Sequence, residues 1–203
     1  MWRPASGAGR ILRYITNMVT QTHRIKHIVT ALFLAVGISL PAQAQDMTLE
    51  GLYQDLLNAD EGAYAAIEEE IFASWDKSRS PAMDLLLQRG ADALLDGNPQ
   101  AAVEHYTALI DHAPQFAGGY FGRASAYYTL GLTGPALDDI AQVLRLDPRH
   151  FGAIEGLAVI MEDLARVQDA LELYEMILAI NPQSVPTKDA IARLQLQLEG
   201  QAL

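Results

Sequence analysis

The sequence contains no cysteine, and only 14 of its 203 residues are lysine or arginine, against 25 aspartates and glutamates. Without cysteine, no disulfide can form and no N-terminal cysteine can carry a lipid. The formal net charge of −11 argues against a nucleic-acid partner, because that binding depends on cationic side chains that neutralise phosphates. Anionic membrane surfaces are disfavoured for the same reason. A basic or apolar peptide surface remains compatible with this charge.

The motifs of common enzyme classes are also missing: there is no His-Glu-x-x-His, no Gly-x-Ser-x-Gly and no phosphate-binding glycine loop after a strand. Carboxylates do occur in runs, at 68–70 and 138–139, but adjacent helical residues point in different directions and cannot address one substrate together. The histidines that follow residue 44, His105, His112 and His150, fall at surface-like positions and form no metal-binding spacing. We therefore predict a protein that is not an enzyme, with no catalytic residue, no metal and no cofactor.

Residues 1–44 differ in kind from the rest, because they contain five basic residues and no acidic one. The apolar run Ile28–Leu40 is followed by Pro41 and by Ala42-Gln43-Ala44. A basic start, a short apolar stretch and a small-x-small end are typical of a secretory signal peptide, here with cleavage expected after Ala44. The run has 13 residues, whereas a membrane-spanning helix needs about 20. We therefore expect an exported protein with no stable membrane anchor after cleavage.

The basic segment before the apolar run is unusually long. Met18 offers an alternative start of conventional length, which would make residues 1–17 an over-extension.

The sequence after the leader has a regular period. Prolines at 114, 148 and 182 are evenly spaced, since 148 − 114 = 34 and 182 − 148 = 34. Small residues recur with the same spacing, at Gly90, Ala124 and Ala158, and at Ala102, Ala136 and Ala170. Such a period indicates repeated helix–turn–helix units whose small residues let two helices approach closely. Gly97 and Gly131 suit the left-handed end of each first helix, and the three prolines stop each second helix.

This pattern resembles the tetratricopeptide repeat (TPR), in which 34-residue helix pairs stack into a solenoid. The resemblance covers residues 83–184 as three units, 83–116, 117–150 and 151–184. It implies an all-α, right-handed solenoid. One departure is that Leu86, Tyr120 and Ile154 replace the family's tryptophan. Another is Ala165 in place of the glycine, which predicts an irregular turn in the third unit.

Helices are predicted at both ends of the array. Residues 45–80 contain two amphipathic stretches, one with Leu49, Leu52, Tyr53, Leu56 and Leu57 and one with Tyr64, Ile67, Ile71 and Trp75. We interpret them as a degenerate helical pair that caps the start of the array. Residues 185–203 supply a final helix that covers the last repeat. Solenoids need such caps because a bare terminal repeat exposes its apolar face.

The resemblance implies a concave groove lined by the first helix of each unit. The family's groove positions, carried over one by one, are Leu87, Ala91 and Leu94, then Phe121, Ser125 and Tyr128, then Glu155, Val159 and Glu162. We take Leu87, Phe121, Ser125, Tyr128, Glu155, Val159 and Glu162 as the candidate partner-binding residues. Tyr120 and Tyr127 are expected in the core. An alternative is that the chain's own ends fill the concavity.

Two further comparisons with the family narrow this hypothesis. Some TPR proteins hold a carboxy-terminal carboxylate with lysine, asparagine and arginine, but the corresponding positions here are Leu87, Ala91, Gly122, Gly152 and Gly156. That clamp is absent. We also expect Arg123 to pair with Asp139 as a structural contact rather than to bind an anion.

The sequence thus predicts a protein-interaction scaffold that binds a peptide or helix of an unidentified protein partner. The resemblance to small exported TPR proteins of Gram-negative bacteria implies a periplasmic location. A self-associating structural subunit, or an accessory factor of a cell-envelope assembly, remains the alternative.

Overall fold

The computed structural model describes residues 49–201, and within this range the chain forms helices and no strand. The helices are α2 Leu49–Asn58, α3 Tyr64–Trp75, α4 Pro81–Leu95, α5 Pro99–His112, α6 Ala117–Thr129, α7 Thr133–Leu146, α8 Phe151–Asp163, α9 Val167–Ile180 and α10 Val185–Gln201. The predicted signal peptide and its cleavage point lie outside the described residues.

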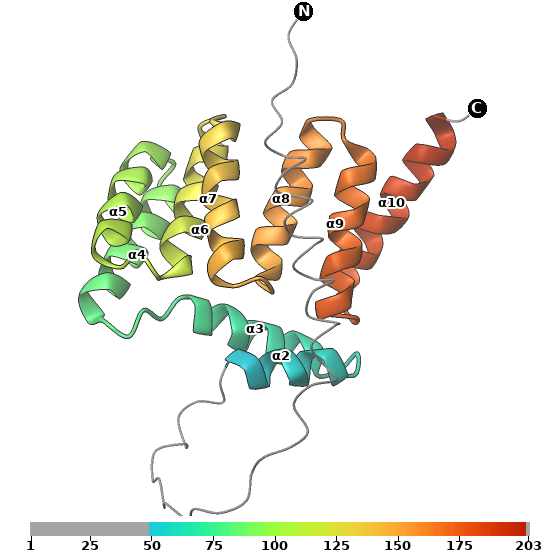
Figure 1. The fold of residues 1–203 in the computed structure, drawn as a ribbon, viewed down its shortest axis with the longest axis horizontal. Helices are drawn as coiled ribbons and strands as arrows, with labels where there is room; N and C mark the ends of the chain where they lie inside the picture. The colour runs from blue at the N-terminus through green and yellow to red at the C-terminus, as the bar shows by residue number, and fades with distance from the viewer. Residues whose placement is uncertain (1–48, 202–203) are drawn as a thin grey trace, which may run out of the picture. The chain divides into compact units, whose positions relative to one another are not determined.

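Helices α4 to α9 form three antiparallel pairs that stand side by side (Figure 1). The second helices begin at 99, 133 and 167 and end at 112, 146 and 180, so both boundaries follow the period of the sequence. Each ends just before one of the periodic prolines. Ala102, Ala136 and Ala170 are completely buried where the paired helices meet. The predicted all-α solenoid is therefore confirmed.

The turn inside each pair uses the left-handed backbone conformation. Gly97 and Gly131 both have φ +72°, and Ala165 reaches φ +54° at the equivalent position. The Arg166 N–H donates to the Met161 carbonyl at 2.8 Å, as the Leu132 N–H does to the Tyr127 carbonyl at 2.8 Å. The prediction of an irregular third turn is thus wrong: Ala165 keeps the turn and accepts the strain of its Cβ, about 1–2 kcal/mol.

Close packing between neighbouring pairs explains two of the glycines. A Cβ added at Gly90 on α4 would lie 2.5 Å from the Tyr106 ring, and one at Gly122 on α6 would lie 2.3 Å from it. The ring of Tyr106, itself buried, is therefore held between the two first helices. At the next interface Ile140 takes the same role, and Gly156 has more room, with the nearest atom at 3.8 Å.

The two ends of the array are covered differently. α10 packs on α9 and buries Leu194. It begins at Val185, one full period after Phe151, so it occupies the place of the first helix of a fourth unit. No such layer lies beyond α4 in the described part of the chain.

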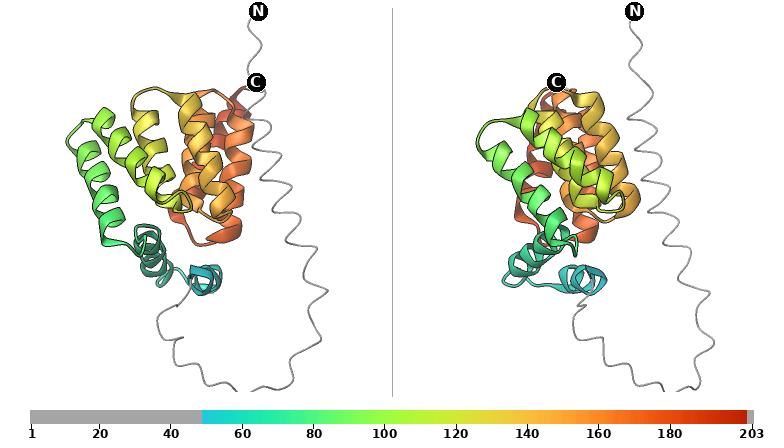
Figure 2. Two further views of the ribbon diagram at one scale, coloured as in Figure 1. Left: turned by 60° about the vertical axis from the view of Figure 1, so that its left-hand side comes forward. Right: turned by 90° about the vertical axis from the view of Figure 1, so that its left-hand side faces the viewer.

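The N-terminal helical pair exists, but its predicted position is wrong. α2 and α3 do not cap the first unit; they cross one end of the array and contact the end of the second unit and the third unit (Figures 1 and 2). Trp75 stacks on His150, which precedes α8, and α2 also contacts α9. The physical reason is that the apolar stripe of the pair ends in large aromatic residues, and aromatic residues at the start of α8 receive them.

Among the described residues, no helix is both long and apolar enough to cross a membrane.

Candidate functional site

A cavity of about 270 Å³ lies between the first helices of the second and third units. Its lining residues come from α6, α7 and α8 and are Phe121, Ala124, Ser125, Tyr128, Ile140, Gly152, Glu155, Gly156, Val159 and Ile160. We call this cavity the α6–α8 pocket. It brings together five of the seven candidate residues: Phe121, Ser125, Tyr128, Glu155 and Val159.

The pocket owes its space to two small residues on α8. Gly152 and Gly156 are four positions apart, so they lie on one helix face and leave room opposite Phe121 and Ser125. An added Cβ at either glycine would meet its neighbours only at ordinary contact distances, 3.4 Å and 3.8 Å. Close helix packing therefore does not demand these glycines, unlike Gly122.

One end of the pocket is closed by a hydrogen bond between its two walls. The Tyr128 hydroxyl donates to Oδ2 of Asp163 on α8 at 2.6 Å. This bond to the carboxylate raises the pKa of Tyr128, because the hydroxyl is held in its protonated form. Tyr128 is otherwise exposed, so its ring forms a rim that solvent and a partner can reach.

The other end of the pocket adjoins the N-terminal pair. The rings of Phe121 and Trp75 both contact His150, with centroids 4.8 Å and 3.6 Å from the imidazole, and the Trp75 ring is stacked on it with planes at 9°. A Cβ at Gly152 would lie 3.5 Å from the Trp75 ring. The chain's own α3 therefore bounds the concavity, yet a cavity remains between α6 and α8.

Glu155 is an acidic residue in the wall of the α6–α8 pocket. Among the described residues it has no hydrogen-bond or ion-pair partner, whereas Glu162 and Asp163 on the same helix both have one. Its side chain is exposed to solvent, although neighbouring protein atoms displace part of the water from the carboxylate and raise its pKa. The pKa of Glu68 on α3 is raised too, first by burial and further by the charge of Glu155. Two carboxylates that lack a cation therefore face the same region.

The remaining candidate residues lie elsewhere. Leu87 packs against the buried cluster around Tyr106 in the first unit. Glu162 is held by Arg193 of α10, at 2.6 Å from Nη1 to Oε2, and accepts the Tyr174 hydroxyl at 2.8 Å. The hydrogen bond from Arg193 is the main reason why the pKa of Glu162 is lowered. The candidate residues therefore do not form a groove that runs continuously through all three units.

The structural pairing predicted for Arg123 is confirmed. Its Nε and Nη2 donate to the two carboxylate oxygens of Asp139, each at 2.8 Å, and Nη1 donates to Thr107. Tyr120 and Tyr127 flank the guanidinium, with ring centroids 5.9 and 5.7 Å away. Both tyrosines are half-buried rather than in the core as expected, because their rings cover this ion pair.

Asp147 is the polar centre of the contact between the N-terminal pair and the array. Its Oδ2 accepts the Tyr53 hydroxyl at 2.7 Å and the Trp75 indole N–H at 3.3 Å. Arg149 pairs with Glu50 on α2 and lies over the Tyr53 ring at 4.2 Å. Burial, followed by the charge of Asp147, raises the pKa of Tyr53 far above its ordinary value.

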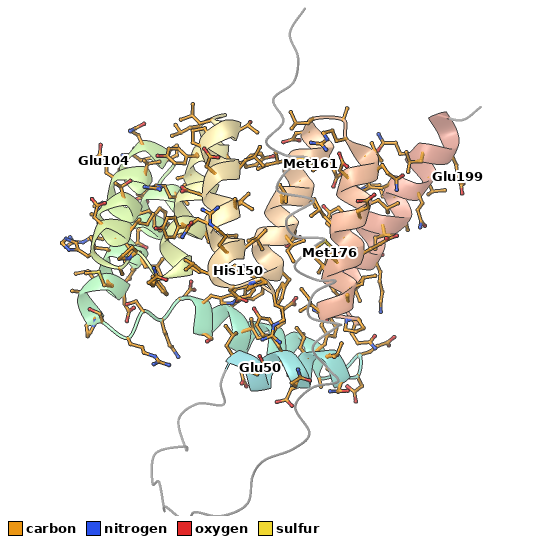
Figure 3. All side chains as sticks on the ribbon, in the orientation of Figure 1. Glu50, Glu104, His150, Met161, Met176 and Glu199 are labelled. Atoms are coloured by element: carbon orange, nitrogen blue, oxygen red, sulfur yellow. The ribbon has the colours of Figure 1, made fainter. Side chains whose placement is uncertain are left out.

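The expectation of a surface position for His150 is wrong. This residue is completely buried at the start of α8, at the end of the array that faces Glu50 and α2 (Figure 3). Its Nδ1 accepts the Ala153 N–H at 3.1 Å and so caps the helix, while Nε2 has no hydrogen-bond partner in the described structure. Burial lowers the pKa of His150 to about 4, so the ring is neutral at pH 7.

Sequence reasoning missed the group formed by Asp147, His150 and Trp75. One signal is available: His150 stands one period after Phe116 and one before Ser184, and all three directly precede a first helix or its equivalent. A polar residue there is typical of a helix cap. Nothing in the sequence shows that a distant helical pair will cover it.

No group of three or more metal-ligating side chains occurs within residues 49–201. The pocket wall offers carboxylate and hydroxyl oxygens and no arrangement suited to nucleophilic catalysis. What the site can do chemically is enclose an apolar side chain and attract a positive charge.

The helix pairs and the pocket define a helical-repeat protein with a small cleft between first helices. The tetratricopeptide repeat family model matches residues 87–134 and 133–185. Residues 87–185 are therefore tetratricopeptide repeats, and the described part of the chain is an all-α TPR solenoid.

Known proteins similar to this chain agree on the repeats. A TPR repeat-containing protein of Rhizobium etli is 28% identical over 162 residues, which is 80% of this chain and 78% of that protein. The Sgt2 TPR domain from Aspergillus fumigatus has a TM-score of 0.55 and 25% identity, covering 61% of this chain and 83% of the domain. The first TPR of Spaghetti (RPAP3), solved with the HSP90 peptide SRMEEVD, has a TM-score of 0.54 and 21% identity, covering 58% of this chain and 93% of that one.

Proposed function

We propose that this protein is a protein-interaction module that binds a segment of a partner protein in the α6–α8 pocket. One observation carries the proposal: five residues at the groove positions that the TPR resemblance implies line a single cavity. The volume of about 270 Å³ is below the ~300–1,000 Å³ of typical small-molecule sites. It suits the insertion of a large side chain from a peptide. The RPAP3 domain adds that this fold can present a peptide site.

The chemistry of the pocket differs from that expected of a site for acidic peptide tails. Gly122, Gly152 and Gly156 stand where a carboxylate clamp would need cations. Glu155 and the rim acid Asp163 would repel an acidic tail. The partner segment we propose is therefore apolar or basic.

A selection from a peptide library tests the proposal. Random peptides displayed on phage are panned against the protein, and the dissociation constants of the selected peptides are measured by fluorescence anisotropy. Phe121→Ala combined with Tyr128→Ala should weaken binding about tenfold or more, because aromatic anchors commonly dominate interface energies. Gly156→Leu, which fills the cavity from the α8 side, should do the same.

Leu95→Ala is the matched control, since Leu95 is an apolar residue of α4 that is 86% exposed and outside the pocket. Circular dichroism verifies that each variant keeps its helices. The proposal fails if no peptide is selected, or if the selected peptides bind the pocket variants as tightly as the parent protein.

The proposed place of action is the periplasm, and it rests on the N-terminal sequence together with the resemblance to exported TPR proteins. Export should remove residues 1–44, so the protein recovered from a Gram-negative envelope extract should begin at Gln45. Its intact mass measures this. A protein that retains the apolar run Ile28–Leu40 would contradict the proposal.

Self-association is a second candidate function, favoured by the bare outer side of the first unit. Leu85 and Leu95 on α4 are 47% and 86% exposed, and no further described helix covers them. The molecular mass in solution at several concentrations decides: a strict monomer excludes self-assembly.

A further inference from the structure

We infer that the partner segment bound in the α6–α8 pocket places a lysine or arginine side chain against Glu155. This inference rests on the proposed function and specifies the chemistry of the ligand.

The geometry singles out Glu155 among the acids near the pocket. Asp163 already accepts the Tyr128 hydroxyl, and Glu162 is already paired with Arg193. Glu155 lines the cavity itself and has no partner within the described structure. A positive group from outside would give it one.

No cation of the described chain fills this role. Arg193 is engaged by Glu162, and Arg123 is engaged by Asp139 on the other side of α6. Partial desolvation raises the pKa of the exposed Glu155 carboxylate, and no positive side chain among the described residues opposes that effect. A positive charge placed against Glu155 would therefore come from the ligand.

The rest of the wall suits the stem of a basic side chain. Lysine and arginine bury their methylene groups on apolar surfaces while the charged head contacts an acid. Phe121, Val159 and Ile160 provide the apolar surface, and the Tyr128 ring at the rim adds an attraction for a cation. A neutral residue inserted here would take water from Glu155 without replacing it, which is unfavourable for a carboxylate.

The electrostatics of the pocket wall favour the same ligand. Partial desolvation raises the pKa of Glu155 and of Glu68, and the charge of Glu155 raises the pKa of Glu68 further. A cation in the pocket against Glu155 would offset that charge. A divalent metal ion is the poorer occupant, because the described residues contain no group of three or more ligands to hold it.

The test uses peptides from the library selection whose binding depends on Phe121 and Tyr128. These peptides should share a lysine or arginine at one position. The strongest is synthesised again with norleucine at that position, and both forms are titrated against the parent protein and against Glu155→Gln. Glu155→Gln keeps the side-chain size and removes the charge.

Either change alone should weaken binding about tenfold, as expected when one member of a partly desolvated charge pair is removed. The two changes together should weaken it little further, because both remove the same contact. Glu175→Gln, an exposed acid on α9, is the matched control and should have no effect.

The outcomes separate this inference from the function on which it depends. Pocket-dependent peptides that lack a basic residue, or that bind Glu155→Gln unchanged, overturn the inference and leave the proposed function standing. Failure to select any pocket-dependent peptide overturns both.

Discussion

The first and third repeats share a sequence pattern but differ in how they are packed. On α8 eight residues are buried, whereas on α4 only Gly90 is. Ile154 is completely buried, and Leu86, at the same position of the repeat, is half-buried. The third repeat has neighbours on both sides and α2–α3 across one end; the first has a neighbour on one side. The burial of a repeat position is therefore decided by what covers the repeat, as expected for a solenoid.

The largest expected effect compares these two positions directly. Ile154→Ala should lower the free energy of unfolding by about 4 kcal/mol, because it leaves a cavity in a closed core. Leu86→Ala should lower it by about 1 kcal/mol, since the site is partly open to solvent. Urea denaturation monitored by circular dichroism measures both. Equal losses would show that the packing difference has no energetic consequence.

The next prediction uses pH to act on His150, the buried residue that precedes α8. Folded His150 has a pKa of about 4, against 6.5 for an unperturbed histidine. As pH falls below 6.5 the unfolded chain takes up a proton that the folded chain refuses, so stability falls until about pH 4. The linked loss approaches about 3 kcal/mol, from about 1.36 kcal/mol per pKa unit. His150→Asn keeps a capping side chain and should abolish this part of the pH dependence.

Urea unfolding at pH 7 and pH 4.5 measures that difference for the parent protein and for His150→Asn. His112→Asn, at an exposed position of α5, is the control. If His150→Asn loses as much stability on acidification as the parent protein does, the buried, neutral ring is not the cause.

Gly122 and Gly156 occupy the same position in successive repeats and test how closely the helices pack at the two interfaces between repeats. Gly122→Ala should destabilise the protein by about 1–3 kcal/mol, because the new methyl group collides with the Tyr106 ring. Gly156→Ala, one repeat later, should instead stabilise it by about 0.5–1 kcal/mol, since alanine favours the helix and its methyl group finds room. Thermal melting of the two variants should shift in opposite directions. Shifts of the same sign would contradict the spacing between these helices.

The smallest expected effect concerns the turn in the third repeat. Ala165→Gly should raise the free energy of unfolding by about 0.5–1 kcal/mol. Glycine removes the strain at φ +54°, and this gain exceeds the cost of its greater conformational freedom in the unfolded chain. Gly131→Ala, the reverse change at the equivalent position, should lower it by a similar amount. Urea denaturation measures both variants. No change in either would mean that the left-handed turn stores no strain.

The sequence is enough to predict the repeats because their signals are local and periodic. Prolines, small residues and turn glycines act within one helix pair, and their regular spacing reveals them. The five pocket residues are predicted from the groove positions that the TPR resemblance implies, and first-helix positions of adjacent repeats do face one another.

The location of α2–α3 could not be predicted, because it depends on contacts between distant parts of the chain. Trp75 and Asp147 are 72 positions apart, and Glu68 and Asn181 are 113 positions apart. An amphipathic pattern indicates that a helix packs against another surface of the protein, but it does not identify that surface. Glu162 is predicted as a groove residue for a related reason. Its position in the repeat does not reveal that Arg193 of the distant helix α10 pairs with its carboxylate.

The central claim is that the α6–α8 pocket receives a partner segment, and amide NMR spectra recorded during titration with a library-selected peptide test it most directly. The claim predicts that the largest shifts occur at Ser125, Gly152 and Gly156, with small changes on α5 and α9. Shifts that cluster on α5, α7 and α9 while those three amides stay unmoved would contradict it.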